Sequence, residues 1–272
     1  MKKTSLILSA IALIFATSCK NDTKKEEKKT ETEMTSTPEE AQKQQKITLT
    51  KLEGSPEFAD ASLKLKSPTE TKQSKKDIEF NFEVENYELG AQTEPEQPNM
   101  LASSAKGQHI HFILDNEPYS AHYESKFSKT LDQGDHVMIA FLSRSYHEAV
   151  KNENSFVVKK FSVGEPSEDQ MMEVDFEAPH MFYSRPKGTY KGEDTQKVML
   201  DFFLVNTDLA TDANQVRATI NGQEFMLDDW VPYVMGGLPM GENTVELELL
   251  DADGNLIDGP YNKTTRTFML EK

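Results

Sequence analysis

Apolar and polar residues alternate strictly in the stretch IEFNFEV, which spans residues 78–84. A period of two places the apolar side chains on one face of an extended chain, which is the pattern of a half-buried β-strand. The same alternation recurs at residues 110–114 and 245–249. Turn residues separate these runs and no amphipathic helix of useful length interrupts them, so the sequence predicts an all-β fold.

An internal repeat divides the chain into two similar halves. Four blocks match in the same order: residues 78–86 with 198–206, 110–119 with 216–225, 131–134 with 238–241, and Phe161 with Phe268. Modules of about 100 residues with short strands and regular turns are typical of immunoglobulin-like β-sandwiches. We therefore predict two tandem immunoglobulin-like modules, residues 47–165 and 170–272, joined near Gly164.

The N-terminus has the order of an export signal. Lysines at positions 2 and 3 precede an apolar stretch at residues 6–16, and small residues lead into Cys19, the only cysteine of the chain. The apolar stretch is too short to span a bilayer, which needs about 20 residues. A lone cysteine in an exported protein cannot close an internal disulfide and needs another use. An ordinary secretory signal with an incidental cysteine is the alternative interpretation.

The segment that ends at Cys19 resembles the lipobox of bacterial lipoproteins. The resemblance implies a signal peptide at residues 1–18, removed on export, and a lipid such as palmitate on Cys19. It also implies an outer-membrane lipoprotein that faces either the periplasm or the cell surface. Residues 19–46 are almost wholly Lys, Glu, Thr, Gln and Ser. This composition cannot bury enough apolar surface to fold, so it predicts a disordered linker.

The formal net charge of the chain is −16. Such a chain repels nucleic acid and anionic membrane surfaces, so we expect no nucleic-acid partner and a membrane contact only through the lipid anchor. Cations or a basic protein partner suit this charge, and solubility alone is the simpler explanation. The sequence has no catalytic-triad order, phosphate-binding glycine loop or zinc-hydrolase helix. We therefore expect a non-enzymatic protein.

The two copies of the repeat differ in two features, and a feature confined to one copy is a candidate for function. The first module carries a long insertion, Gly90–Gly107. Loops of this length are often functional or disordered. Five of the six histidines lie between His109 and His147, all in the first module.

A hairpin with its turn at residues 115–118 would place His111 opposite His122, on the face that His109 shares. Facing residues have Cβ atoms about 4.5–5.5 Å apart, so three imidazoles would converge. Neutral imidazole suits zinc and copper, and ordinary surface histidines are the alternative. The predicted metal ligands are His109, His111, His122 and, in support, His136.

The second module supplies a control for this interpretation. Arg217 takes the place of His111, and Asp228 takes that of His122. Opposite charges at facing positions make an ordinary cross-strand ion pair. Two opposed histidines repel each other when both are protonated, so the comparison favours a shared metal ion in the first module.

The histidine pattern resembles that of uncharacterised secreted bacterial domains built on G-x-H-x-H, L-x-x-G-x-H and a further histidine. The matching residues are Gly107, His109, His111, Leu131, Gly134, His136 and His147. The whole chain, with Leu52–Pro56 and Phe141–His147, looks like a group of lipoproteins from marine Bacteroidota. Some of those relatives are labelled phosphopeptide-binding, which implies a protein- or phosphopeptide-interaction module as the alternative function. Its contacts would be Arg144 and His147, in a segment similar to the S-x-x-H strand start of forkhead-associated domains but one residue longer.

Two strands are apolar on both faces. The second faces carry Val137, Ile139 and Phe141 in the first module, and Met199, Phe203 and Val205 in the second. A strand that is apolar on both faces should be covered on both. We predict that these two patches meet as an interface between the modules, with docking of a partner as the alternative.

Overall fold

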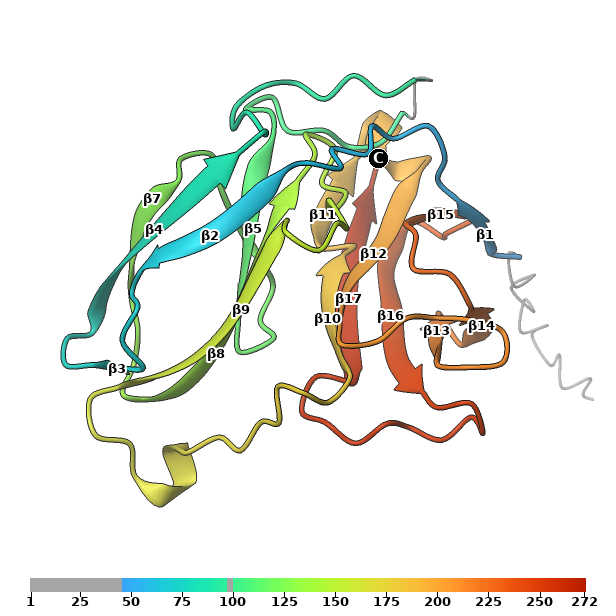
Figure 1. Ribbon diagram of the computed structural model, residues 1–272. Helices are drawn as coiled ribbons and strands as arrows, with labels where there is room; N and C mark the ends of the chain where they lie inside the picture. The colour runs from blue at the N-terminus through green and yellow to red at the C-terminus, as the bar shows by residue number, and fades with distance from the viewer. Residues whose placement is uncertain (1–45, 97–99) are drawn as a thin grey trace, which may run out of the picture. The chain divides into compact units, whose positions relative to one another are not determined.

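The computed structural model describes residues 46–96 and 100–272, and these form seventeen strands and two short 3₁₀ helices (Figure 1). The strands of the first half are β2 (Ser62–Ser67), β3 (Lys72–Gln73), β4 (Asp77–Glu85), β5 (His109–Leu114), β6 (Ser120–His122), β7 (Lys126–Thr130), β8 (Gly134–Ser143) and β9 (Phe156–Val163). Those of the second half are β10 (His180–Arg185), β11 (Gly188–Lys191), β12 (Val198–Val205), β13 (Gln215–Ile220), β14 (Gln223–Leu227), β15 (Tyr233–Gly236), β16 (Gly241–Leu250) and β17 (Lys263–Glu271). The remaining elements are β1 (Thr48–Lys51), η1 (Glu168–Gln170) and η2 (Gly192–Thr195).

The first module is a sandwich of a three-stranded sheet, β2-β4-β7, and a five-stranded sheet, β3-β9-β8-β5-β6. The alternating residues of β4 explain how the two sheets pack. Phe80 points into the core, where its ring centroid lies 4.8 Å from that of Phe112 and 6.1 Å from that of Phe161. The glutamates between the apolar residues of β4 stay at the surface.

The second module repeats this plan with the sheets β1-β15-β12-β10 and β11-β17-β16-β13-β14. Strands β10, β12 and β15 hold the positions of β2, β4 and β7. In both modules the second segment of the first strand, β3 or β11, pairs in parallel with the last strand, β9 or β17. The predicted all-β fold of two immunoglobulin-like sandwiches is therefore confirmed.

Strand β1 corrects the predicted start of the first module at residue 47. It pairs antiparallel with β15, from Thr48 opposite Gly236 to Lys51 opposite Tyr233, and so extends a sheet of the second module. Ile47 lies in the core of that module. The pairing satisfies backbone groups of β15 that would otherwise remain at the sheet edge.

The predicted interface between the modules is confirmed within the described residues. One hydrophobic cluster contains Ile139 and Phe141 of β8 together with Phe203 and Val205 of β12. The rings of Phe141 and Phe203 stack with centroids 4.7 Å apart. Every residue of β12 is buried, because one face covers its own sandwich core and the other covers β8.

A buried carboxylate adds polar contacts to the same interface. Asp201 of β12 is fully buried, and its Oδ2 accepts a hydrogen bond of 2.9 Å from the backbone N–H of Ala149. Its Oδ1 lies 2.7 Å from Nζ of Lys151. These partners come from the loop after β8, so the interface is specified by charge as well as by apolar area.

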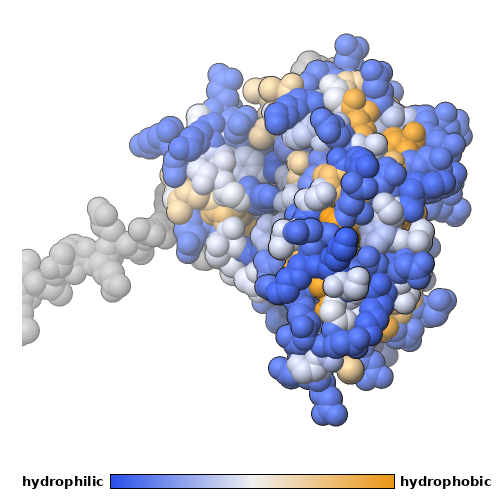
Figure 2. Space-filling model, turned by 90° about the vertical axis from the view of Figure 1, so that its left-hand side faces the viewer, coloured by the Kyte–Doolittle hydropathy of each residue, from blue (hydrophilic) through white to orange (hydrophobic). Residues whose placement is uncertain are grey.

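The face of the first module seen in Figure 2 is mostly hydrophilic, with small separate hydrophobic areas. The large apolar side chains that are exposed in the described residues are scattered singly: Met100, Met171, Met226, Met240 and Leu256. Single exposed apolar residues are ordinary for a folded protein. No helix in residues 46–96 and 100–272 is long and apolar enough to cross a membrane.

Candidate functional site

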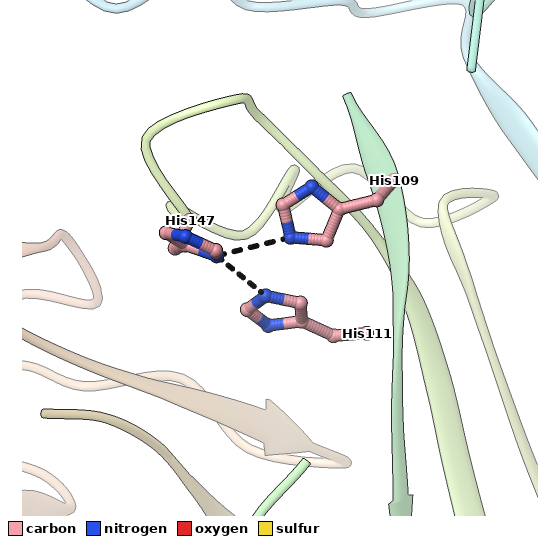
Figure 3. Close-up of side chains that lie close together, drawn as sticks. All are labelled: His109, His111 and His147. Atoms are coloured by element: carbon pink, nitrogen blue, oxygen red, sulfur yellow. Dashed lines mark hydrogen bonds between the residues drawn. The ribbon is translucent and has the colours of Figure 1, made fainter. Parts of the chain in front are cut away.

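Three histidines of the first module point at one another (Figure 3). His109 and His111 lie two positions apart on β5, so they share a face of the strand, and His147 approaches from the loop after β8. Nδ1 of His147 lies 3.1 Å from Nε2 of His109 and 3.5 Å from Nε2 of His111. One ring nitrogen from each of the three lies within 4.8 Å of the others.

A tight turn holds His147 in place. The backbone N–H of His147 donates to the carbonyl of Arg144 at 2.8 Å, and the N–H of Arg144 donates to the carbonyl of Glu148 at 2.8 Å. His147 has a φ of 71°, in the left-handed region, which histidine tolerates better than most non-glycine residues. The turn therefore aims the imidazole inward, toward β5.

The ring of His109 is oriented by the inserted loop. Its Nδ1 donates a hydrogen bond of 2.8 Å to the carbonyl of Gly107, which leaves the lone pair of Nε2 facing the other two rings. Gly107 has a φ of 83°, and a Cβ at this position would lie 2.2 Å from the carbonyl oxygen of Gly90. Only glycine fits there, so the end of the insertion fixes the tautomer of His109.

The second module contributes to the surroundings of His111. The Oγ atom of Ser184, on β10, lies 3.4 Å from Nδ1 of His111, and Oγ of Ser143 lies 3.2 Å from its Nε2. The ring of Tyr119 stacks on that of His111 with centroids 3.6 Å apart and an angle of 17° between the planes. His111 is fully buried as a result.

Burial keeps all three imidazoles neutral near pH 7. It lowers the pKa of His109 to about 4 and, together with the nearby Arg185, that of His147 to about 2. It also holds the pKa of His111 well below the usual range, an effect that His109 and His147 reinforce. Neutral imidazoles present lone pairs, which is the form that binds metal ions.

His122 does not belong to this cluster, and the predicted hairpin register is wrong. Ile110, not His111, faces His122 across the β5–β6 ladder. Because side chains alternate along a strand, a shift of one residue moves His122 to the opposite face. There its ring stacks on that of Phe127 with centroids 3.4 Å apart.

The shift comes from the turn. Asp115 and Asn116 have φ values of 51° and 56° and form a two-residue turn, closed by a 2.8 Å bond from the N–H of Glu117 to the carbonyl of Leu114. Such a turn with two left-handed residues is a favoured hairpin connection. The returning strand contains one residue more than a two-residue turn requires. The resulting register differs by one residue from the register that the predicted four-residue turn would give.

His136 also lies outside the cluster. Its Nδ1 is 2.7 Å from Oδ2 of Asp115 and its Nε2 is 3.1 Å from the carbonyl oxygen of Asp132. The hydrogen bond with Asp115 raises the pKa of His136. Both ring nitrogens are therefore occupied, one by the hairpin turn and the other by the segment before β8, and His136 is not placed to join the other histidines.

The expected ion pair of the second module is different too. Arg217 pairs with Glu248 of β16 at 2.6 Å, and not with Asp228. Oδ2 of Asp228 instead accepts a 2.8 Å hydrogen bond from the hydroxyl of Thr211. Arg217 occupies the position that corresponds to His111, and its side chain reaches the neighbouring strand β16. In the first module, the same direction leads to the loop at residues 144–148.

Arg144 is not available to a phosphorylated peptide. Its guanidinium is buried, donates to the carbonyls of Pro56 and Ala149, and lies 3.2 Å from Oε1 of Glu148. An arginine that recognises phosphate must offer its N–H groups to the ligand. The geometry assigns Arg144 to holding the loop that carries His147, so the peptide-binding alternative loses the arginine on which it depended.

The sequence patterns missed part of the surroundings but contained a signal for His147. This residue is the further histidine that follows the G-x-H-x-H and L-x-x-G-x-H patterns, although its predicted role was peptide contact. Tyr119 was not among the predicted site residues. Arg185 and Lys187, which flank Tyr119 from the second module, could not be found because nothing local in the sequence links them to β5.

Comparisons with known proteins leave the family open. No protein-family model and no curated protein sequence matches the chain. The fibronectin(III)-like modules of CbhA from Clostridium thermocellum align with a TM-score of 0.27 and 11% identity, over 77% of this chain and 94% of that one. SGBP-B of the mixed-linkage glucan utilization locus of Bacteroides ovatus, solved with a heptasaccharide, gives 0.23 and 10%, over 77% and 70%. PorU from Porphyromonas gingivalis gives 0.23 and 13%, over 86% and 21%. Scores this low carry no inference about family or function.

Proposed function

We propose that this chain is a non-catalytic binding protein whose first module holds a transition-metal ion. The ligand atoms are Nε2 of His109, Nε2 of His111 and Nδ1 of His147. A tetrahedral ion with bonds of about 2.0–2.1 Å to nitrogen has ligand atoms roughly 3.3 Å apart. Two of the three separations, 3.1 and 3.5 Å, fit this spacing, and all three nitrogens lie within 4.8 Å of one another. This agreement is the observation that carries the proposal.

The chemistry of the ligands points to zinc or copper. Three neutral imidazoles suit zinc, copper and nickel, and no thiolate adds a softer ligand within the described residues. The nitrogen of His109 that faces away from the cluster donates to the carbonyl of Gly107. This is the usual outer contact of a metal-binding histidine. His147, the most accessible of the three rings, marks the side from which an ion enters.

Titration of the full chain with Zn²⁺ and Cu²⁺ at pH 7 tests the proposal, with binding followed by calorimetry. The wild-type chain should take up one ion. Loss of an outer contact of a ligand already costs about 10–100-fold in affinity, so His111→Ala, which removes a ligand, should cost at least about 100-fold. His147→Asn should have a similar effect, and asparagine suits the left-handed backbone at this position.

His122→Ala is the matched control. It removes a histidine from the same hairpin, but its ring lies on the opposite face against Phe127. Its affinity should equal that of the wild type. Equal losses in His111→Ala and His122→Ala, or no binding by the wild type beyond that of a random histidine pair, would overturn the proposal.

We also propose that the chain is a lipoprotein anchored by Cys19 at the outer membrane, in the periplasm or at the cell surface. Cys19 lies outside the described residues, so the sequence alone supports this step. In cells of the native host, the wild-type protein should partition into the detergent phase on Triton X-114 extraction. The variant Cys19→Ser should move to the aqueous phase. The same phase for both proteins would contradict a lipid on this cysteine.

A further inference from the structure

Arg185 is a buried cation that forms no ion pair with a carboxylate in residues 46–96 and 100–272. This residue at the end of β10 is only 6% exposed; its NH1 donates to the hydroxyl of Tyr119 at 2.8 Å, and its guanidinium lies 5.3 Å from the centre of the Tyr190 ring. Its Nε has no hydrogen-bond partner among the described residues. Buried charges are costly unless they are paired, so this arrangement calls for a negative charge close to Tyr119.

A second cation converges on the same phenol. Nζ of Lys187 lies 4.2 Å from the centre of the ring of Tyr119 and donates to its backbone carbonyl. The described part of the chain offers Lys187 no carboxylate within ion-pair distance, since its charge-bearing neighbours are Arg185 and Lys129. In a chain with a net charge of −16, two cations thus contact one tyrosine without an ion pair to any described carboxylate.

Tyr119 also lies at the edge of the histidine cluster. Its hydroxyl oxygen is 3.3 Å from Nδ1 of His147, and its ring stacks on that of His111. The distance of 3.3 Å is again that expected between two ligands of one tetrahedral ion. The hydroxyl oxygen therefore lies next to one of the three proposed ligand nitrogens, and it is also the atom to which Arg185 donates.

We propose that the hydroxyl oxygen of Tyr119 is the fourth ligand of the metal ion and binds it as a phenolate. Arg185 and Lys187 are positioning residues that offset the charge of this ligand. The inference rests on the proposed histidine site. On binding, the O–H bond of Tyr119 breaks, a bond from oxygen to the metal forms, and the proton passes to solvent. The metal ion is then the cation bound to the phenolate. The phenolate in turn is the negative charge next to Arg185.

The types of ligand atom favour a metal ion in the oxidation state +2. Thioether and thiolate ligands select Cu(I), whereas imidazole nitrogen and anionic oxygen favour divalent ions. Three imidazoles and a phenolate, next to two fixed cations, thus suit Cu(II) or Zn(II). A site of neutral ligands alone would hold a dication beside Arg185 and Lys187 with nothing to offset the repulsion.

Cu²⁺ is the probe for the test, because a phenolate bound to Cu(II) gives a charge-transfer absorption that imidazole alone does not. The wild-type chain should show this band at one equivalent of Cu²⁺. It should also release protons in weakly buffered solution at pH 6.5, because the phenol loses its proton when it binds the ion. Tyr119→Phe should lose the band, release fewer protons and bind Cu²⁺ at least about tenfold more weakly.

Tyr123→Phe is the matched control. The ring of Tyr123 lies 5.0 Å from that of His109, but its hydroxyl is hydrogen-bonded to Oγ of Ser104 at 2.7 Å. This variant should keep the band and the proton release. Lys187→Met should move the band to a different wavelength without removing it, which a purely structural role of the lysine would not do.

The outcomes separate the two proposals. One bound ion with no charge-transfer band, no proton release and equal affinity in Tyr119→Phe would overturn the phenolate ligand and leave the histidine site standing. Absence of tight binding in the wild type would overturn both. Proton release by the unmodified chain is measured without any substitution, so the test does not depend on the folding of a variant.

Discussion

Lowering the pH from 7 to 5 is expected to reduce the free energy of unfolding by several kcal/mol in the metal-free chain. His109, His111 and His147 have pKa values lowered by burial, so they stay neutral in the folded chain and become protonated only when it unfolds. The stability that they contribute is complete above the unfolded value of about 6.5 and is lost as the pH falls toward the folded values. His109 and His147 each account for about 1.6 kcal/mol between pH 6.5 and 5, and His111 changes the stability in the same direction.

Two groups oppose this trend. The pKa of His136 is raised by its hydrogen bond with Asp115, so its stabilisation is present at low pH and is lost as the pH rises through its folded pKa. Burial raises the pKa of Glu148, which also favours the folded chain on acidification. The net fall in stability should therefore be smaller than the sum over the three buried histidines.

Urea unfolding followed by the fluorescence of Trp230 at several pH values measures this effect. The variant His147→Asn removes one buried titrating group and keeps a residue that accepts the left-handed backbone. Its stability should depend less steeply on pH, by about 1.4 kcal/mol per pH unit between pH 6 and 5. A wild-type stability that is flat or rises on acidification would show that the cluster is not held neutral.

Replacing Phe203 by alanine should lower the free energy of unfolding by about 3–5 kcal/mol. Phe203 is fully buried between the modules, where its ring lies 4.7 Å from that of Phe141, 4.8 Å from that of Phe156 and 5.1 Å from that of Trp230. Removal of the ring leaves a cavity that both modules line. Thermal or urea unfolding measures the loss, and hydrogen exchange should increase in both β8 and β12.

Met226→Ala is the control for this substitution. Met226 is 49% exposed on β14 of the same module, so its truncation should change stability by no more than about 0.5 kcal/mol. If Phe203→Ala were as mild as Met226→Ala, or affected exchange in β12 alone, the apolar contact would not couple the modules.

The fold was predictable because its main signals are local or repeated. The alternation at residues 78–84 identifies a half-buried strand whatever its partners are, and the matching blocks fix the order of strands in both modules. The strands that contain Phe141 and Phe203 are apolar on both faces. This pattern is also local, and it predicts that both faces are covered. The pairing of β1 with β15 was not predictable, because it joins segments far apart in the chain that share no pattern.

The site was predictable only in part because strand register decides it. Whether His122 joins His109 and His111 depends on one residue in the hairpin, because a one-residue shift moves its side chain to the other face. The residue types in the turn do not show which of the two hairpin registers forms. The contributions of Ser184 and Arg185 depend on how the second module packs against β5, which no short stretch of sequence encodes.

The pairing of β1 with β15 means that the second module is discontinuous in the chain, with the first module inserted between its parts. Both ends of the described chain, Ile47 in the core and β17 in the sheet, belong to the second module. A mechanical load applied between residue 46 and the C-terminus would therefore act first on the four residue pairs of β1 and β15. The histidine cluster lies outside that load path, so tension on the chain would strain the second module before it reached the proposed metal site.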